Sequence, residues 1–151
     1  MATIDYGTGE REMRCTAWTL VVYEQEFKGT EGVKGDLIAD TMGKVIATSD
    51  DILTVNGDGA FVTVVEDYTR VDWNATMRSL WAMLRTAADI AQSKGQPYVP
   101  TGSYDEWTRT LLEVEPDMHE VRKLVGKELQ RGLFRAGAAA SGKTSDAGQE
   151  G

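Results

Sequence analysis

The stretch from Asp72 to Gln92 constrains the fold of this chain more than any other, because it has the pattern of a long amphipathic helix. Asp72 or Asn74 can cap its first turn by accepting from a free backbone N–H, and Ser93-Lys94-Gly95 ends the pattern. Other helices must supply large apolar faces to cover the stripe. The apolar residues recur at three- and four-residue spacing: Met77, Leu80, Trp81, Leu84, Ala87, Ala88 and Ala91.

Size and charge exclude several classes of protein. At 151 residues the chain suits one domain, and its net charge of −8 opposes binding to nucleic acid or to an anionic membrane surface. No apolar run approaches the roughly 20 residues that span a bilayer, and the N-terminus lacks the features of a signal peptide. The single cysteine, Cys15, excludes an internal disulfide framework. These features predict a cytosolic protein.

The segment from Thr16 to Phe27 has two interpretations. The Val-Val-Tyr run at its centre favours a strand. Helical spacing of its apolar residues, a capping threonine at Thr16 and a stop signal at Gly29 favour a helix, which we prefer.

Three shorter patterns complete the helical prediction. Residues 36–42 form a short helix capped by Asp36. Ser103 and Glu106 make a capping box, in which each side chain satisfies a free N–H, at the start of a helix whose apolar face extends to Val114. Pro116 begins the last helix, which reaches residue 135. The stripe of that helix is Met118, Val121, Leu124, Val125, Leu129 and Leu133.

The region from 45 to 65 has β character. Residues 52–55 and 60–65 are rich in β-branched side chains, and the Asn-Gly-Asp-Gly turn at 56–59 separates them. Residues 45–47 are a candidate third strand. This hairpin must pack on the helices, since a lone hairpin is only marginally stable.

The predicted fold is therefore mainly α with a small β-hairpin, an α+β domain of four to five helices spanning residues 13–135. Residues 1–12 are polar and aperiodic, which predicts a flexible N-terminal arm. Residues 136–151 are small and polar with nothing to bury, which predicts a disordered tail.

Two patterns imitate ligand sites. Residues 137–144 match the phosphate-loop pattern GxxxxGKT, but that motif requires a preceding strand and a following helix, and here a helix precedes it. Asn56, Asp58 and Gly59 match part of a calcium loop, yet Val65 stands where the closing acid belongs. We expect neither a nucleotide nor a metal site, and no cofactor.

No catalytic group emerges from the remaining residues. His119 is the only histidine, has no second ligand at metal spacing, and fits a solvated helix position. Cys15 has no base near it in sequence and is best interpreted as a small buried hydrophobe. We therefore expect a protein that is not an enzyme.

The four tryptophans divide by position. Trp81 and Trp107 have the phase of core residues. Trp18 and Trp73 stand at helix starts and are better candidates for a partner-binding surface, because tryptophan is enriched at interface hot spots. Two tyrosines, Tyr68 and Tyr104, complete the predicted partner-binding set.

The order of four segments resembles the tail assembly chaperones of long-tailed bacteriophages (siphoviruses). The matching segments are YEQEF at 23–27, DLI at 36–38, LWAM at 80–83 and SYDEW at 103–107, and the resemblance covers residues 13–135. It implies a small helical protein of the host cytoplasm, absent from the finished virion. Such a protein binds the tape-measure protein, keeps it soluble, and helps recruit tail-tube subunits such as the major tail protein.

Two other interpretations compete with this one. A head–tail connector or tail-completion subunit has the same acidic α+β character but stays in the assembled particle. A small nucleotide hydrolase that uses the tail's GKT predicts ATP binding that Lys143→Ala abolishes, and we expect none. Self-association is compatible with each interpretation.

Overall fold

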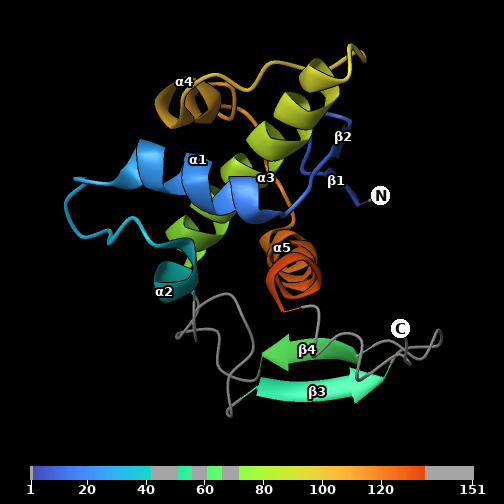
Figure 1. Ribbon diagram of the computed structural model, residues 1–151. Helices are drawn as coiled ribbons and strands as arrows, with labels where there is room; N and C mark the ends of the chain where they lie inside the picture. The colour runs from blue at the N-terminus through green and yellow to red at the C-terminus, as the bar shows by residue number, and fades with distance from the viewer. Residues whose placement is uncertain (1, 42–50, 56–60, 66–71, 135–151) are drawn as a thin grey trace, which may run out of the picture.

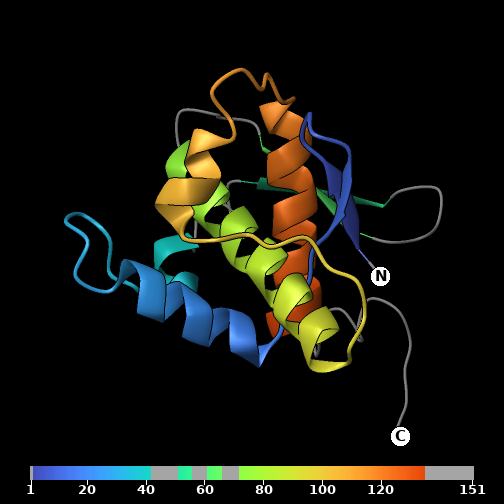
Figure 2. The same ribbon diagram turned by 90° about the horizontal axis from the view of Figure 1, so that it is seen from above.

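The computed structural model describes residues 2–41, 51–55, 61–65 and 72–134, and in these residues it has five helices and two antiparallel hairpins (Figure 1). The mainly helical α+β fold is as the sequence predicts. Helix α3 (Trp73–Ser93) is central: it packs against α1 on one side and α5 on another (Figure 2). Asp72 caps it by accepting from the Ala75 N–H at 3.0 Å, and Leu80 and Trp81 are fully buried.

Helix α1 (Ala17–Phe27) confirms the helical interpretation of its segment. The Thr16 hydroxyl accepts from the Trp18 N–H at 3.1 Å, and the Thr19 hydroxyl accepts from the Thr16 N–H at 2.9 Å, so both free donors are satisfied. Phe27 meets Trp81 of α3 edge-on, with ring centroids 5.6 Å apart. This aromatic contact fixes the C-terminal end of α1 on the central helix.

Helix α2 (Leu37–Thr41) is the short helix expected after the glycine-rich loop. The Asp36 carboxylate accepts from the Ala39 N–H at 3.1 Å, as a capping residue should. Leu37 is buried in the core, while Met42 lies outside the described residues.

Helix α4 (Tyr104–Arg109) begins at the predicted capping box: the Ser103 hydroxyl accepts from the Glu106 N–H, and the Glu106 carboxylate accepts from the Ser103 N–H. The helix is shorter than its apolar face suggests. The chain leaves α4 after Arg109 through successive turns, yet Leu111 and Val114 still pack against the core.

Helix α5 (Met118–Leu133) starts two residues later than predicted. Asp117 is its N-cap and accepts from the N–H groups of His119 and Glu120, so Pro116 lies before the helix. A proline suits the first turn, but the aspartate carboxylate satisfies the free donors directly and therefore sets the start. Three residues of the predicted stripe are fully buried: Val121, Val125 and Leu129.

The prediction of a flexible arm over residues 1–12 is wrong for residues 3–12. Strands β1 (Thr3–Asp5) and β2 (Glu10–Glu12) pair antiparallel, with Thr3 opposite Glu12. Ile4 and Tyr6 are each only 2% exposed, and the Tyr6 hydroxyl accepts from the Trp107 indole N–H at 3.1 Å. The buried side chains of Ile4 and Tyr6 therefore fix the N-terminal hairpin against the rest of the protein. Their alternation with polar residues is a two-residue period, which is the signal that predicts a strand.

Strands β3 (Asp51–Val55) and β4 (Phe61–Val65) confirm the predicted hairpin. Val55 pairs with Phe61, and β4 lies next to α5, while the predicted turn at 56–59 lies outside the described residues. The candidate third strand at 45–47, the phosphate-loop pattern at 137–144 and the tail at 136–151 lie outside the described residues.

Candidate functional site: an exposed tryptophan on helix α1

A tryptophan surface forms where the start of α1 meets the second half of α3. It consists of Trp18 and Val21 on α1 and Arg85 and Asp89 on α3. Trp18 is 43% exposed and Val21 38%. The phase of α1 explains their exposure, because its opposite face carries the buried side chains Thr19, Val22, Tyr23 and Phe27.

The exposed indole of Trp18 has a defined orientation. Its N–H donates to the Asp89 carboxylate at 2.7 Å, and Asp89 also accepts from Arg85 at 3.2 Å, one helical turn earlier. The polar edge of the ring is therefore satisfied within the protein, while much of its apolar face remains in solvent. A held aromatic side chain loses little rotamer freedom on binding, which suits it to anchor a partner.

Trp73 lies at the other end of α3. It is half-buried, and its ring meets the ring of His119 edge-on at 5.6 Å, so it joins the first turns of α3 and α5. Sixteen residues separate Trp73 from Asp89, which is about 24 Å along a helix axis. Trp73 and Trp18 therefore do not form one surface.

Tyr104 belongs to the aromatic core more than to the surface. It is half-buried, its ring meets Phe27 at 5.0 Å, and its N–H donates to the Glu26 carboxylate at 2.8 Å. Burial raises the pKa of its phenol. Tyr68 lies outside the described residues, so Trp18 is the predicted partner-binding residue that the structure places most openly on the surface.

The remaining tryptophans are core residues, as predicted. Trp81 is 0% exposed and its indole N–H donates to the Gly102 carbonyl oxygen at 3.2 Å, while Trp107 is 2% exposed. These contacts explain two of the four tryptophans by packing alone.

Cys15 is buried, in agreement with its interpretation as a small hydrophobe. Burial, reinforced by the nearby Glu128 carboxylate, raises the pKa of its thiol to about 12. A thiol with that pKa stays protonated at neutral pH and is a poor nucleophile. Within the described part of the chain, no three acidic, histidine or cysteine side chains gather in a way that could hold a metal ion.

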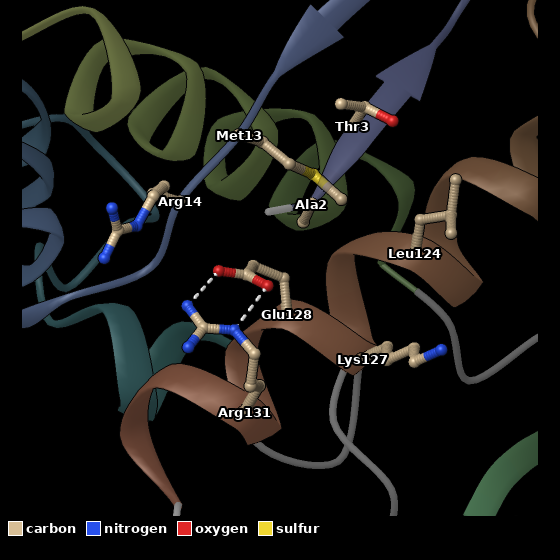
Figure 3. A pocket seen from close by; sticks show the side chains of 8 residues that line it. All are labelled: Ala2, Thr3, Met13, Arg14, Leu124, Lys127, Glu128 and Arg131. Atoms are coloured by element: carbon tan, nitrogen blue, oxygen red, sulfur yellow. Dashed lines mark hydrogen bonds and ion pairs between the residues drawn. The ribbon is translucent and has the colours of Figure 1, made fainter. Parts of the chain in front are cut away.

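A second feature is a pocket of about 590 Å³ between the β1–β2 hairpin and α5, which we call the hairpin–α5 pocket (Figure 3). Glu128 lies in it and is 3% exposed. Its carboxylate accepts from the Cys15 N–H at 2.8 Å and from the Arg131 guanidinium. Sequence reasoning missed Glu128, because an acidic residue on a helix is normally solvated and only the tertiary fold buries this one.

A buried polar cluster lies under the loop before α2. The Tyr23 hydroxyl donates to the Asp40 carboxylate at 2.9 Å and accepts from Arg78 at 3.1 Å. Asp40 also accepts from the N–H groups of Lys34 and Gly35, which folds the loop onto α1. Burial raises the pKa of Tyr23 above its usual range, so this phenol remains a donor. These bonds use the Tyr23 hydroxyl both as a donor and as an acceptor, and they engage both oxygens of Asp40.

Comparison with protein-family models, characterised proteins and solved structures finds no match to this chain. No helix in the described part of the chain has the length and apolar character needed to cross a membrane.

Proposed function

We propose that this protein is a non-enzymatic phage tail assembly chaperone that binds the tape-measure protein and keeps it soluble in the host cytoplasm. The proposal originates in the resemblance of residues 13–135 to that family. The observation that carries it on the molecule is the exposed, hydrogen-bonded Trp18 at the start of α1.

The tryptophan surface suits a helical partner. A long tape-measure helix presents apolar stripes that aggregate unless covered. Trp18 and Val21 are three residues apart on α1, so they face the same way and can pack against such a stripe. Arg85 and Asp89 beside them supply both signs of charge, which can select the register of the bound helix. We propose that bound tape then recruits tail-tube subunits.

The alternative is a connector or tail-completion subunit of the same acidic character that remains in the particle. The two functions differ in where the chain is found after assembly. Mass spectrometry of purified virions detects the chain if it is a connector and does not if it is a chaperone.

The direct test is co-expression of the tagged chain with the tape-measure protein from the same genome. We expect the tape to become soluble and to co-purify, and Trp18→Ala to reduce the recovered tape severalfold, since aromatic anchors dominate interface energy. Leu112→Ala is the matched control, because Leu112 is 87% exposed but lies far along the chain in the turn after α4. Circular dichroism verifies that both variants fold.

The outcome that refutes the proposal is insoluble tape with the chain eluting alone. If the tape binds but Trp18→Ala and Leu112→Ala reduce binding equally, the tryptophan surface is the wrong site. Trp73→Ala then tests the junction of α3 and α5.

A further inference from the structure

We propose that the hairpin–α5 pocket binds an acidic peptide segment that carries apolar side chains beside its carboxylates. This site is separate from the tryptophan surface and goes beyond the function proposed above. The pocket has an apolar floor with cations around it, and these two features favour such a peptide.

One face of α5 forms a wall of the pocket. Leu124, Lys127, Glu128 and Arg131 follow at spacings of three, one and three residues, so they lie along a single helical stripe about 10 Å long. Ala2 and Met13, from the hairpin and its exit, complete the apolar part with Leu124 (Figure 3).

The charges of the pocket are strongly biased. Arg14, Lys127 and Arg131 contribute three positive charges, and Glu128 contributes one negative charge, in a chain whose net charge is −8. Arg131 is neutralised by Glu128 through two hydrogen bonds. In the part of the chain that the structure describes, neither the Arg14 guanidinium nor the Lys127 ammonium has an ion-pair partner.

The placement of these two cations favours two separate carboxylates over one compact anion. Arg14 and Lys127 lie on opposite sides of Glu128 in Figure 3. A single phosphate is normally held by converging donors, such as a bidentate arginine or backbone N–H groups. Two acidic side chains on a peptide can reach the two cations separately while an apolar neighbour covers the half-buried Ala2 and Leu124.

Nucleic acid is disfavoured even though its phosphates are also spaced along a chain. The net charge of −8 repels any polyanion over a Debye length, and nucleic acid has no aliphatic side chain to place on Leu124, whereas an acidic peptide offsets the repulsion by apolar contact. The pocket volume of about 590 Å³ is within the range of sites that bury a small ligand or a few side chains.

Fluorescence anisotropy of the full chain with a labelled peptide of sequence LEELLEELLE, at low salt, tests the site. We expect the peptide to bind saturably to the native chain. The double variant Arg14→Gln, Lys127→Gln should bind it about fivefold more weakly, since exposed ion pairs contribute modestly to binding free energy. Leu124→Ser should weaken it as well. The control Lys34→Gln with Arg109→Gln makes the same charge change elsewhere and should leave binding unchanged.

Three results overturn the proposal. The first is absence of peptide binding, and the second is an equal effect of the pocket variant and its control. The third is displacement of the peptide by an oligothymidylate of equal charge, which indicates an unselective anion site. Lys127→Glu, at an exposed position, repeats the test if the double variant unfolds. Trp18→Ala should leave peptide binding intact, which separates this site from the tryptophan surface.

Discussion

A methyl group on Gly132 should destabilise the fold, although alanine is the better helix former. Gly132 lies in the last turn of α5, where the chain from the hairpin crosses the helix. A Cβ atom there would lie 2.1 Å from the Cys15 carbonyl oxygen and 2.8 Å from the carbonyl carbon. A carbon and an oxygen normally approach to roughly 3.3 Å, so the two segments must separate by about 1 Å.

The Cys15 backbone cannot move away freely. Its N–H donates to the buried Glu128 carboxylate at 2.8 Å, and its carbonyl oxygen accepts from Arg131 at 3.4 Å. Overpacking typically costs 1–3 kcal/mol and a strained hydrogen bond to a buried carboxylate adds to it, against a gain of at most about 1 kcal/mol in helix propensity. We expect Gly132→Ala to lower the free energy of unfolding by about 2 kcal/mol.

Urea unfolding followed by tryptophan fluorescence measures this, because Trp81 and Trp107 are buried. Lys123 is half-exposed on the same helix, so the difference between Lys123→Ala and Lys123→Gly gives the intrinsic advantage of alanine there. If Gly132→Ala is as stable as the native chain or more so, the close approach of α5 to Cys15 is wrong.

Two further predictions concern buried polar groups. Tyr23→Phe should lower the free energy of unfolding by about 1–2 kcal/mol, because the buried Asp40 carboxylate loses a donor. The hydroxyl of Tyr104 makes no hydrogen bond to any described residue, so Tyr104→Phe should lower the free energy of unfolding by less. Equal losses in the two variants would contradict the hydrogen bond from Tyr23 to Asp40. The Cys15 thiol has an ordinary pKa near 9 in the unfolded chain and a pKa of about 12 in the folded protein. Above pH 9 the thiol therefore ionises in the unfolded chain first, and the stability that is present below pH 9 is lost as the pH rises toward 12. Between pH 7 and 10 this loss is on the order of 1 kcal/mol, and Cys15→Ala should reduce the fall in unfolding free energy by a similar amount; an unchanged fall refutes it.

Local signals in the sequence account for most of the helices. Thr16, Asp72 and Ser103 are capping residues whose side chains meet backbone donors within three positions, so the interaction is visible in the sequence itself. The stripe of α3 is long enough for its period to be unambiguous. Trp81 and Trp107 follow as core residues from the same phase argument.

Features that depend on distant segments could not be predicted in this way. Glu128 is buried because Cys15, 113 residues earlier, presents its N–H to the carboxylate. Asp40 is buried because the Tyr23 hydroxyl reaches it from another helix. The N-terminal hairpin is different: the alternation of Ile4 and Tyr6 was available, but two apolar residues in a polar arm are a weak signal until Trp107 supplies a partner for the tyrosine.

The two proposed binding sites share one support. Three consecutive residues are fixed to three helices: the Arg14 N–H donates to the Met83 carbonyl oxygen of α3 at 3.2 Å, Cys15 binds α5 through Glu128, and Thr16 caps α1. Arg14 lines the hairpin–α5 pocket, and the helix that Thr16 begins carries the tryptophan surface. A change that loosens this crossing should therefore weaken binding at both sites, whereas a change in either site alone should weaken only its own partner.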